Sequence, residues 1–194
     1  LDAQEPQKKM RLVGRTWELS QIREGIAQLA AQTGGVLILK STANGMGTTS
    51  LLIEAEKQAE QAGVNCSFCT NQSPNQPAFN GIKNLLEDLL EDKAANDALL
   101  SFFGETENQF EKWTAFSAFR DLLVTATPHL VIIDNLAQSD QGTIEILEYL
   151  IRNLADKPVL FILGLHSVTV EGTLEGITTG STTDVTPTEI PLGP

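Results

Sequence analysis

The chain has 194 residues, of which 41% are hydrophobic, enough for one sizeable core. Its 25 Asp and Glu residues outnumber its 13 Lys and Arg residues, which gives a formal net charge of -12. This acidic balance disfavours a surface that neutralises nucleic-acid phosphates or binds anionic membranes, so we expect no nucleic acid and no membrane as partners.

The start of the chain and its two cysteines narrow the class further. The sequence begins at Leu1 without a methionine, which suggests a piece of a longer protein, and residues 1–9 are expected to be an N-terminal extension or linker. No signal peptide or membrane-length apolar run is recognisable, and we expect a cytoplasmic location. Cys66 and Cys69 lie on opposite faces of a strand-like stretch, and two His residues are too few to complete a four-ligand zinc site. We therefore expect two reduced thiols in a buried strand.

Helical and strand-like periodicities alternate along the first half of the chain. Leu19, Ile22, Ile26 and Leu29 form one helical stripe, and the glycine-bounded stretch that follows is apolar. Gly63 is a typical residue to end the next helix. The elements expected here are a helix over 17–32, a strand over 34–40, a helix over 48–63 and a strand over 64–70.

The second half continues the alternation after a polar, proline-bearing loop over 70–78. Trp17 in the first helix and Trp113 in a later one sit on apolar stripes, so we expect both rings in the core. The elements expected here are helices over 82–90, 94–103, 111–126 and 142–155, strands over 129–136 and 158–167, and a candidate fifth strand over 188–192.

Apolar strands separated by helices predict an α/β protein with a parallel sheet that is covered on both faces. Right-handed crossovers then give a three-layer αβα sandwich with a five-stranded sheet. Ligands of such sheets bind beyond the carboxyl ends of the strands. Three polar stretches fall at these ends, namely STANGMG over 41–47, DNLAQSD over 134–140 and GLHS over 164–167. The sequence therefore predicts a ligand site at this edge of the sheet.

The stretch after the first strand has the outline of a phosphate-binding loop, G-x-x-x-x-G-K-S/T. Gly47 and Thr49 match this pattern, and Gly45 adds an extra glycine. Thr42 replaces the first glycine, and Thr48 replaces the lysine that reaches the outer phosphates. On these residues alone, a nucleotide-binding loop and an ordinary strand-to-helix turn both remain open.

Several stretches, taken in order, resemble the AAA-type ATPase modules of the STAND class, which are regulatory ATPases of large signalling proteins. RLVGRTWELSQI is similar to their VGRExEL opening box, HLVIIDNLAQSD to their Walker B strand, and PVLFILGLHS to the strand that follows. SPNQPAFNGIKNLLEDLL resembles their Pro-and-aromatic segment with its helix, and TEIPLGP the strand before the lid. The likeness covers residues 10–194 and implies a P-loop NTPase domain of AAA type from which the lid subdomain is absent.

This resemblance assigns roles at the carboxyl edge of the sheet. It implies that Val13, Gly14 and Arg15 lie against adenine, and that Thr49 and Asp134 hold magnesium. It also implies that Gly45 and Gly47 cradle the phosphates. The nucleotide-binding residues that it implies in the loop are Asn44, Gly45, Met46, Gly47, Thr48, Thr49 and Ser50.

The chain departs from the family's pattern after the third and fourth strands. Asn135 replaces the second acid, which activates the attacking water, and Ser167 replaces an arginine, with His166 beside it. Lys40 could stand in for the loop lysine, but a solvated or edge lysine is the simpler expectation. His166 is expected to be a hydrogen-bonded surface histidine.

These losses shape the expected function. Removing the lysine removes a charge-assisted contact of about 1.5–3 kcal/mol, and Asn135 cannot accept a proton. We therefore expect a degenerate nucleotide-binding regulatory module, a pseudo-ATPase, with no catalytic residue and weak or no ATP hydrolysis. Its ligand would be ATP or ADP with Mg²⁺, unless the site holds none, and its partners would be neighbouring domains of the same polypeptide or other proteins. A protein-interaction scaffold and a functional ATP-hydrolysing switch are the alternatives.

Overall fold

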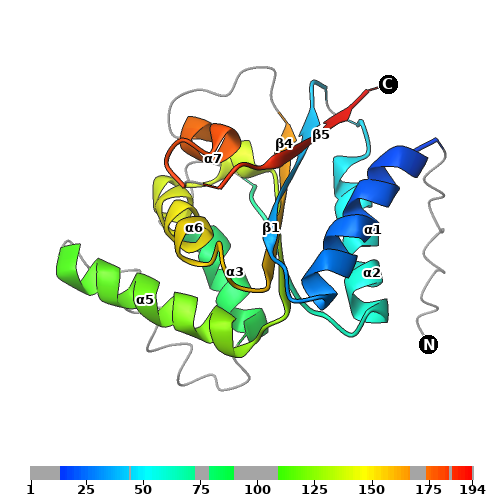
Figure 1. The fold of residues 1–194 in the computed structure, drawn as a ribbon. Helices are drawn as coiled ribbons and strands as arrows, with labels where there is room; N and C mark the ends of the chain where they lie inside the picture. The colour runs from blue at the N-terminus through cyan, green and yellow to red at the C-terminus, as the bar shows by residue number, and fades with distance from the viewer. Residues whose placement is uncertain are drawn as a thin grey trace, which may run out of the picture.

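The computed structural model describes residues 14–43, 45–72, 79–89, 109–166, 174–183 and 185–193. Helices and strands alternate along the described chain (Figure 1). In order they are α1 (Thr16–Ala30), β1 (Gly35–Ser41), α2 (Thr48–Gln61), β2 (Asn65–Thr70), α3 (Asn80–Leu89), α5 (Gln109–Thr125), β3 (His129–Asp134), η1 (Leu136–Gln138), α6 (Gln141–Asn153), β4 (Val159–His166), α7 (Glu175–Thr179) and β5 (Thr188–Leu192).

The strands form one five-stranded sheet in the order β2-β3-β4-β1-β5, and every pairing in it is parallel. Figure 1 shows the sheet nearly edge-on, with α1 and α2 on one side and α3, α5, α6 and α7 on the other. All six residues of β3 are buried, as expected for a strand whose two faces are both covered by helices. The predicted three-layer αβα sandwich with a parallel five-stranded sheet is confirmed.

Strand alternation divides the core into two clusters, one on each face of the sheet. Leu37 and Leu39 of β1 pack with the α1 and α2 residues, whereas Val36 and Ile38 pack with the α3, α5 and α6 residues. The same alternation carries on to the strand ends. Ser41, Asp134 and His166 therefore share the α1–α2 face, and Lys40 lies on the other face.

The element boundaries differ from the sequence pattern in a few places. The third strand ends at Asp134 instead of residue 136, because Asn135 adopts a left-handed backbone with φ 54°. Helix α7 and the 3-10 turn η1 were not predicted, since five and three residues are too short to show a helical period. The helix expected over 94–103 and the extension expected over 1–9 lie outside the described residues.

The two tryptophans do not lie in the core, so that prediction is wrong. Trp17 is 52% exposed and Trp113 is 50% exposed. Trp17 lies in the first turn of α1, ahead of the buried stripe, and Trp113 lies at the edge of its stripe with its ring against Phe116 and Tyr149. A ring at the margin of an apolar stripe covers its neighbours without being enclosed itself.

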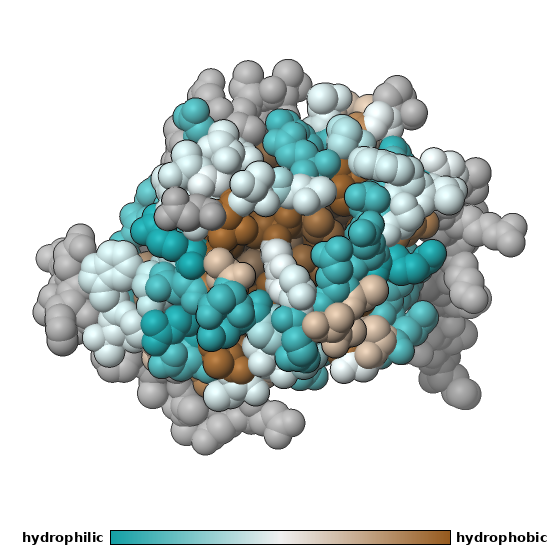
Figure 2. All heavy atoms as spheres, viewed as in Figure 1, coloured by the Kyte–Doolittle hydropathy of each residue, from teal (hydrophilic) through white to brown (hydrophobic). Residues whose placement is uncertain are grey.

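The two cysteines lie on opposite faces of β2, as expected, but β2 is an edge strand and Cys66 is only half-buried. Cys66 packs with the cluster on the α1–α2 face, Cys69 is buried in the cluster on the opposite face, and both are thiols. Seen from the side used in Figure 1, the surface is mostly hydrophilic, with hydrophobic residues visible in a hollow between the two helical layers (Figure 2). None of the helices in the described ranges has the length and hydropathy that a membrane span needs.

Candidate functional site

The turn between β1 and α2 has the backbone of a phosphate-binding loop. Gly45 and Gly47 take left-handed conformations, with φ 81° and 85°, and Gly47 is the N-cap of α2. A Cβ added to either glycine would meet no atom within 4 Å, so the conformation and not crowding requires glycine here. The N–H groups of the first turn of a helix have no partner within the helix and carry its positive dipole end. The loop and the start of α2 together can therefore bind an anion.

A carboxylate from the third strand reaches the first turn of this helix. The Thr49 hydroxyl donates a hydrogen bond of 2.7 Å to Asp134 Oδ2. Asp134 is 1% exposed, and its Oδ1 accepts a hydrogen bond of 2.9 Å from the backbone N–H of Asn135. A hydroxyl and a carboxylate are the oxygen ligands that Mg²⁺ prefers, so the pair fits this cation. The groups expected to hold magnesium are thus side by side.

His166, in one of the three stretches predicted to meet at this edge of the sheet, belongs to the same cluster. It pairs with Ser41 in the register of β1 and β4, and its Nδ1 lies 2.8 Å from Ser41 Oγ. Its Nε2 lies 3.5 Å from Asp134 Oδ1, and its side chain is 18% exposed. The expected hydrogen bond of His166 is confirmed, although its side chain is half-buried and not on the open surface. The alternation of side chains along the strands predicts this proximity, because it places both His166 and Asp134 on the α1–α2 face.

The resemblance expects charged side chains at positions 48 and 135, where this chain has Thr and Asn. Thr48, at the lysine position, is 1% exposed, and its hydroxyl has no hydrogen-bond partner within the described residues. Asn135, at the position of the second acid, donates from its side-chain amide to the Asn71 carbonyl, at 3.2 Å. Asn71 follows β2 and in turn donates to the Ser139 hydroxyl at 2.8 Å. The Asn135 side chain thus braces the ends of β2 and β3.

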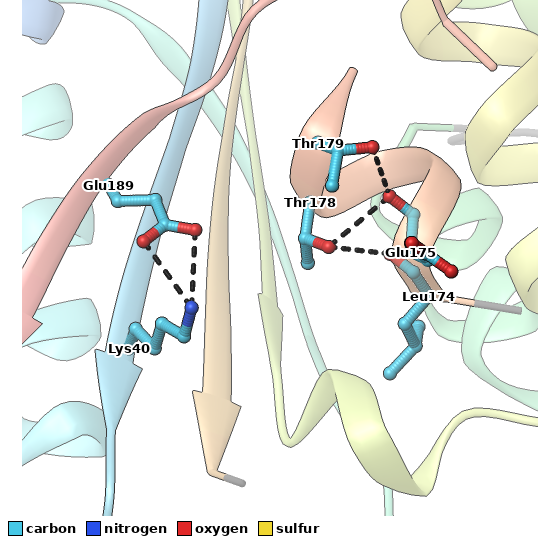
Figure 3. A network of polar contacts seen from close by, with 6 residues as sticks. All are labelled: Lys40, Leu174, Glu175, Thr178, Thr179 and Glu189. Atoms are coloured by element: carbon cyan, nitrogen blue, oxygen red, sulfur yellow. Dashed lines mark hydrogen bonds and ion pairs between the residues drawn. The ribbon is translucent and has the colours of Figure 1, made fainter. Parts of the chain in front are cut away.

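Lys40 does not replace the loop lysine. It projects from the face of β1 opposite Asp134, and its Nζ lies 3.3 Å from Glu189 Oε1 on β5 (Figure 3). The expectation was a solvated or an edge lysine. The solvated one is found, because β1 lies between β4 and β5 and the contact with Glu189 is exposed. The same view shows α7 nearby, where the Thr178 and Thr179 hydroxyls donate to backbone carbonyls of Leu174 and Glu175. This face carries structural contacts and not the loop.

The segment before α1 also reaches the loop. Gly14 has φ 83°, and Arg15 is the N-cap residue of α1. The Arg15 guanidinium donates to the Met46 carbonyl at 2.9 Å, and thereby ties this segment to the phosphate-binding loop. Ser50 lies in the first turn of α2, half-buried. The remaining predicted positions, Val13, Asn44 and Ser167, lie outside the described residues.

The fold and this edge define a class of protein. A parallel sheet with a glycine loop after β1, a helix that starts at the loop, and a buried aspartate at the end of β3 are the parts of a P-loop NTPase of AAA type. The chain belongs to the AAA ATPase domain family, whose model matches residues 11–162. No curated protein sequence matches the chain.

Solved structures with this fold include replication initiators. The Aeropyrum pernix ORC2 protein in its ADP form has a TM-score of 0.58 and 15% identity, over 90% of this chain and 46% of that chain. The AMPPCP-bound DnaA from Aquifex aeolicus has a TM-score of 0.51 and 16% identity, over 92% of this chain and 47% of that chain. The chain spans less than half the length of these proteins, and identities at this level show the fold alone.

The sequence-based exclusion of nucleic acid is wrong. The Aeropyrum pernix ORC1 protein, solved in complex with DNA, has the same fold with a TM-score of 0.54 and 15% identity, over 93% of this chain and 45% of that chain. Net charge is a sum over the whole chain, whereas contact with DNA phosphates needs only a local group of basic side chains. An acidic total therefore does not exclude this class of partner.

Proposed function

We propose that this chain is a nucleotide-binding regulatory module of the STAND class, and that it holds ATP or ADP with Mg²⁺ but hydrolyses ATP slowly or not at all. The observation that carries the proposal is the Thr49–Asp134 hydrogen bond of 2.7 Å beneath a loop bent by Gly45 and Gly47. A plain strand-to-helix turn does not require a buried carboxylate from a third strand at its helix start. We also propose that residues 10–194 form the P-loop domain.

Each part of the site has a role in this proposal. The amides of Gly45 to Thr49 would contact the phosphates, and Thr49 and Asp134 would hold the cation, directly or through water. Bound Mg²⁺ neutralises phosphate charge. With Thr48 in place of lysine, one charge-assisted contact is missing, which weakens nucleotide affinity about 10- to 100-fold. With Asn135 in place of the second acid, no side chain would accept a proton from the attacking water. This lowers the expected rate of ATP hydrolysis by a factor of about 10² to 10⁴.

Nucleotide binding is tested by the melting temperature of the protein with Mg-ATP or Mg-ADP. At about 100 times the Kd, a bound ligand adds about 2.7 kcal/mol to the free energy of unfolding. Thr49→Val should abolish the shift, because it removes the hydroxyl and keeps the shape. Thr125→Val is the matched control, since Thr125 is an exposed threonine on α5, remote in sequence from the loop. No shift at millimolar nucleotide in the wild-type protein would reject the proposal and favour an interaction scaffold.

Hydrolysis is tested separately by phosphate release. We expect no Mg²⁺-dependent turnover above the level of an Asp134→Ala variant. Turnover that the wild-type protein shows and Asp134→Ala lacks would establish the functional ATP-hydrolysing switch instead.

The likeness to the DNA-bound ORC1 protein makes DNA the second ligand to test. Fluorescence anisotropy of a labelled duplex, with and without Mg-ATP, measures it. Binding that weakens steeply with salt supports DNA contact, and unchanged anisotropy at low salt rejects it for this chain. A cytoplasmic location remains part of the proposal, and the two thiols fit such a reducing compartment.

A further inference from the structure

One arginine joins three segments that are far apart in the sequence. The Nη2 of Arg15 donates to the Met46 carbonyl of the phosphate-binding loop at 2.9 Å and to the Gly193 carbonyl, just after β5, at 2.6 Å. Its Nη1 donates to Glu18 Oε1 at 2.8 Å. The same guanidinium therefore fixes the start of α1, the loop and the end of β5 relative to one another.

The contact with Met46 bears on the direction of a loop amide. In a trans peptide the carbonyl and the following N–H point in opposite directions. Because Arg15 holds the Met46 carbonyl, it also holds the Gly47 N–H pointing the other way, away from the guanidinium. Gly47 has φ 85° and gives no steric resistance to rotation of this peptide. The hydrogen bond from Arg15 thus supplies a constraint that glycine itself lacks.

The guanidinium is held in place for this task. The Arg15 and Glu18 side chains are 16% and 11% exposed, so their ion pair is shielded from solvent. Both hydrogens of Nη2 are used, one on each carbonyl, while Nη1 serves Glu18. A lysine is shorter and presents a single ammonium, so it cannot make the same planar set of contacts.

We infer that Arg15 is a positioning residue that couples the phosphate-binding loop to the end of β5. It holds the loop in its anion-binding shape, and a change in the loop moves or frees the segment around Gly193. That occupancy of the loop by a nucleotide drives this coupling rests on the proposed function. The positioning role of Arg15 does not rest on it, since its contacts join residues of this chain alone. This coupling is reciprocal. If bound nucleotide shifts the conformational equilibrium at the end of β5 by some factor, a ligand that favours the shifted state raises nucleotide affinity by the same factor.

The positioning role of Arg15 is tested first without nucleotide, by hydrogen exchange of the backbone amides. Arg15→Met keeps the length and removes the donors, and Arg15→Lys keeps the charge. Both should speed exchange about fivefold or more in 45–51 and also in 188–193, while exchange in β3 stays unchanged and so reports intact folding. Arg23→Met, at an exposed arginine on the same helix, should change neither segment.

The coupling is then tested with Mg-ATP. In the wild-type protein the nucleotide should slow exchange in 188–193, and in both Arg15 variants this effect should vanish while affinity falls about tenfold. If the wild-type protein binds no nucleotide, the proposed function fails, but the first experiment still tests whether Arg15 positions the loop and the end of β5. Unchanged exchange in 45–51 in both variants overturns the inference. Full rescue by Arg15→Lys also overturns it, because charge alone would then explain the role of Arg15.

Discussion

Thr48 lies at the position where the phosphate-binding loop pattern has a lysine. The residue is 1% exposed, and a Cβ built on Gly164 of β4 would lie only 3.2 Å from its methyl group. Thr48 therefore packs its methyl against the sheet, where the absence of a side chain at residue 164 leaves room. Its hydroxyl has no hydrogen-bond partner in the described part of the chain. The position contributes packing and no charge.

A lysine at position 48 should strengthen the nucleotide binding that we propose. Thr48→Lys is expected to bind Mg-ATP about 10- to 100-fold more tightly than the wild-type protein, because it adds one charge-assisted contact with the phosphates. Titration calorimetry at a fixed salt concentration measures it. Thr48→Met is the control, since it has similar length and no charge, and it should not gain affinity. Equal affinities for the two variants would mean that the loop does not hold phosphate at this point.

A histidine at the start of β3 makes stability depend on pH. His129 is 2% exposed, its Nε2 lies 3.0 Å from Ser67 Oγ, and its Nδ1 has no hydrogen-bond partner among the described residues. Burial lowers the pKa of His129 from 6.5 to about 4. Below about pH 6.5, His129 is therefore protonated in the unfolded chain but neutral in the folded protein. The free energy of unfolding falls as the pH is lowered, until the pH reaches about 4.

The size of this effect follows from the pKa difference. Each pH unit below 6.5 lowers the free energy of unfolding by about 1.4 kcal/mol. Between pH 7.5 and pH 5, His129 should therefore lower it by about 2 kcal/mol. Urea unfolding at both pH values measures it, with His129→Leu as the variant that cannot titrate. The wild-type protein should lose about 2 kcal/mol more than the variant. Equal losses would show that His129 is protonated in the folded protein.

At the residue scale, the sequence predicts those site residues whose spacing lies within one short stretch. Gly45, Gly47 and Thr49 follow from the loop pattern, and the structure places them around one turn. The contacts of His166 with Ser41 and Asp134 depend on β4 lying next to both β1 and β3, and spacing along the chain does not give that order. The Arg15 contact with Gly193 joins residues 178 positions apart, which a local pattern cannot show.

At the scale of elements, the junction between β1 and α2 depends on one backbone conformation. Gly47 caps α2 with φ 85°, a region that costs other residues about 1–2 kcal/mol. Gly47→Ala should therefore lower the free energy of unfolding by this amount, as measured with urea. Gly35→Ala is the matched control, because a Cβ there also meets nothing within 4 Å but the backbone is extended. That variant should be neutral or gain up to about 1 kcal/mol. Equal losses would point to packing instead of conformation.

The start of α6 explains why its boundary matched the sequence pattern closely. Asp140 caps the helix and accepts hydrogen bonds from Thr143 N at 2.9 Å and from Thr143 Oγ1 at 2.7 Å. The same carboxylate accepts from Phe79 N at 2.7 Å, just before α3. The cap can be read from the sequence, since aspartate before an apolar stripe is a usual start. Its second role cannot, because it depends on how α3 and α6 pack against each other.

At the scale of the whole molecule, the layers could be predicted and the order of the strands could not. Buried strands such as β3 and β4 are apolar along their length, which requires cover on both faces and so predicts the sandwich. Sheet order depends on which crossovers fit, and several right-handed arrangements share one pattern. The short helix α7 adds its contacts late in the chain and carries too few residues to predict.

The net charge of -12 should make the protein more stable in salt. Excess like charge repels itself in the compact state, and raising salt from 10 to 150 mM shortens the Debye length from about 30 to 8 Å. We therefore expect the melting temperature at pH 7.5 to rise over this range, in sodium or potassium chloride alike. Replacing two exposed acids, Glu60→Gln and Glu87→Gln, should reduce the rise. A fall in melting temperature would mean that ion pairs such as Arg15–Glu18 stabilise the fold more than repulsion destabilises it.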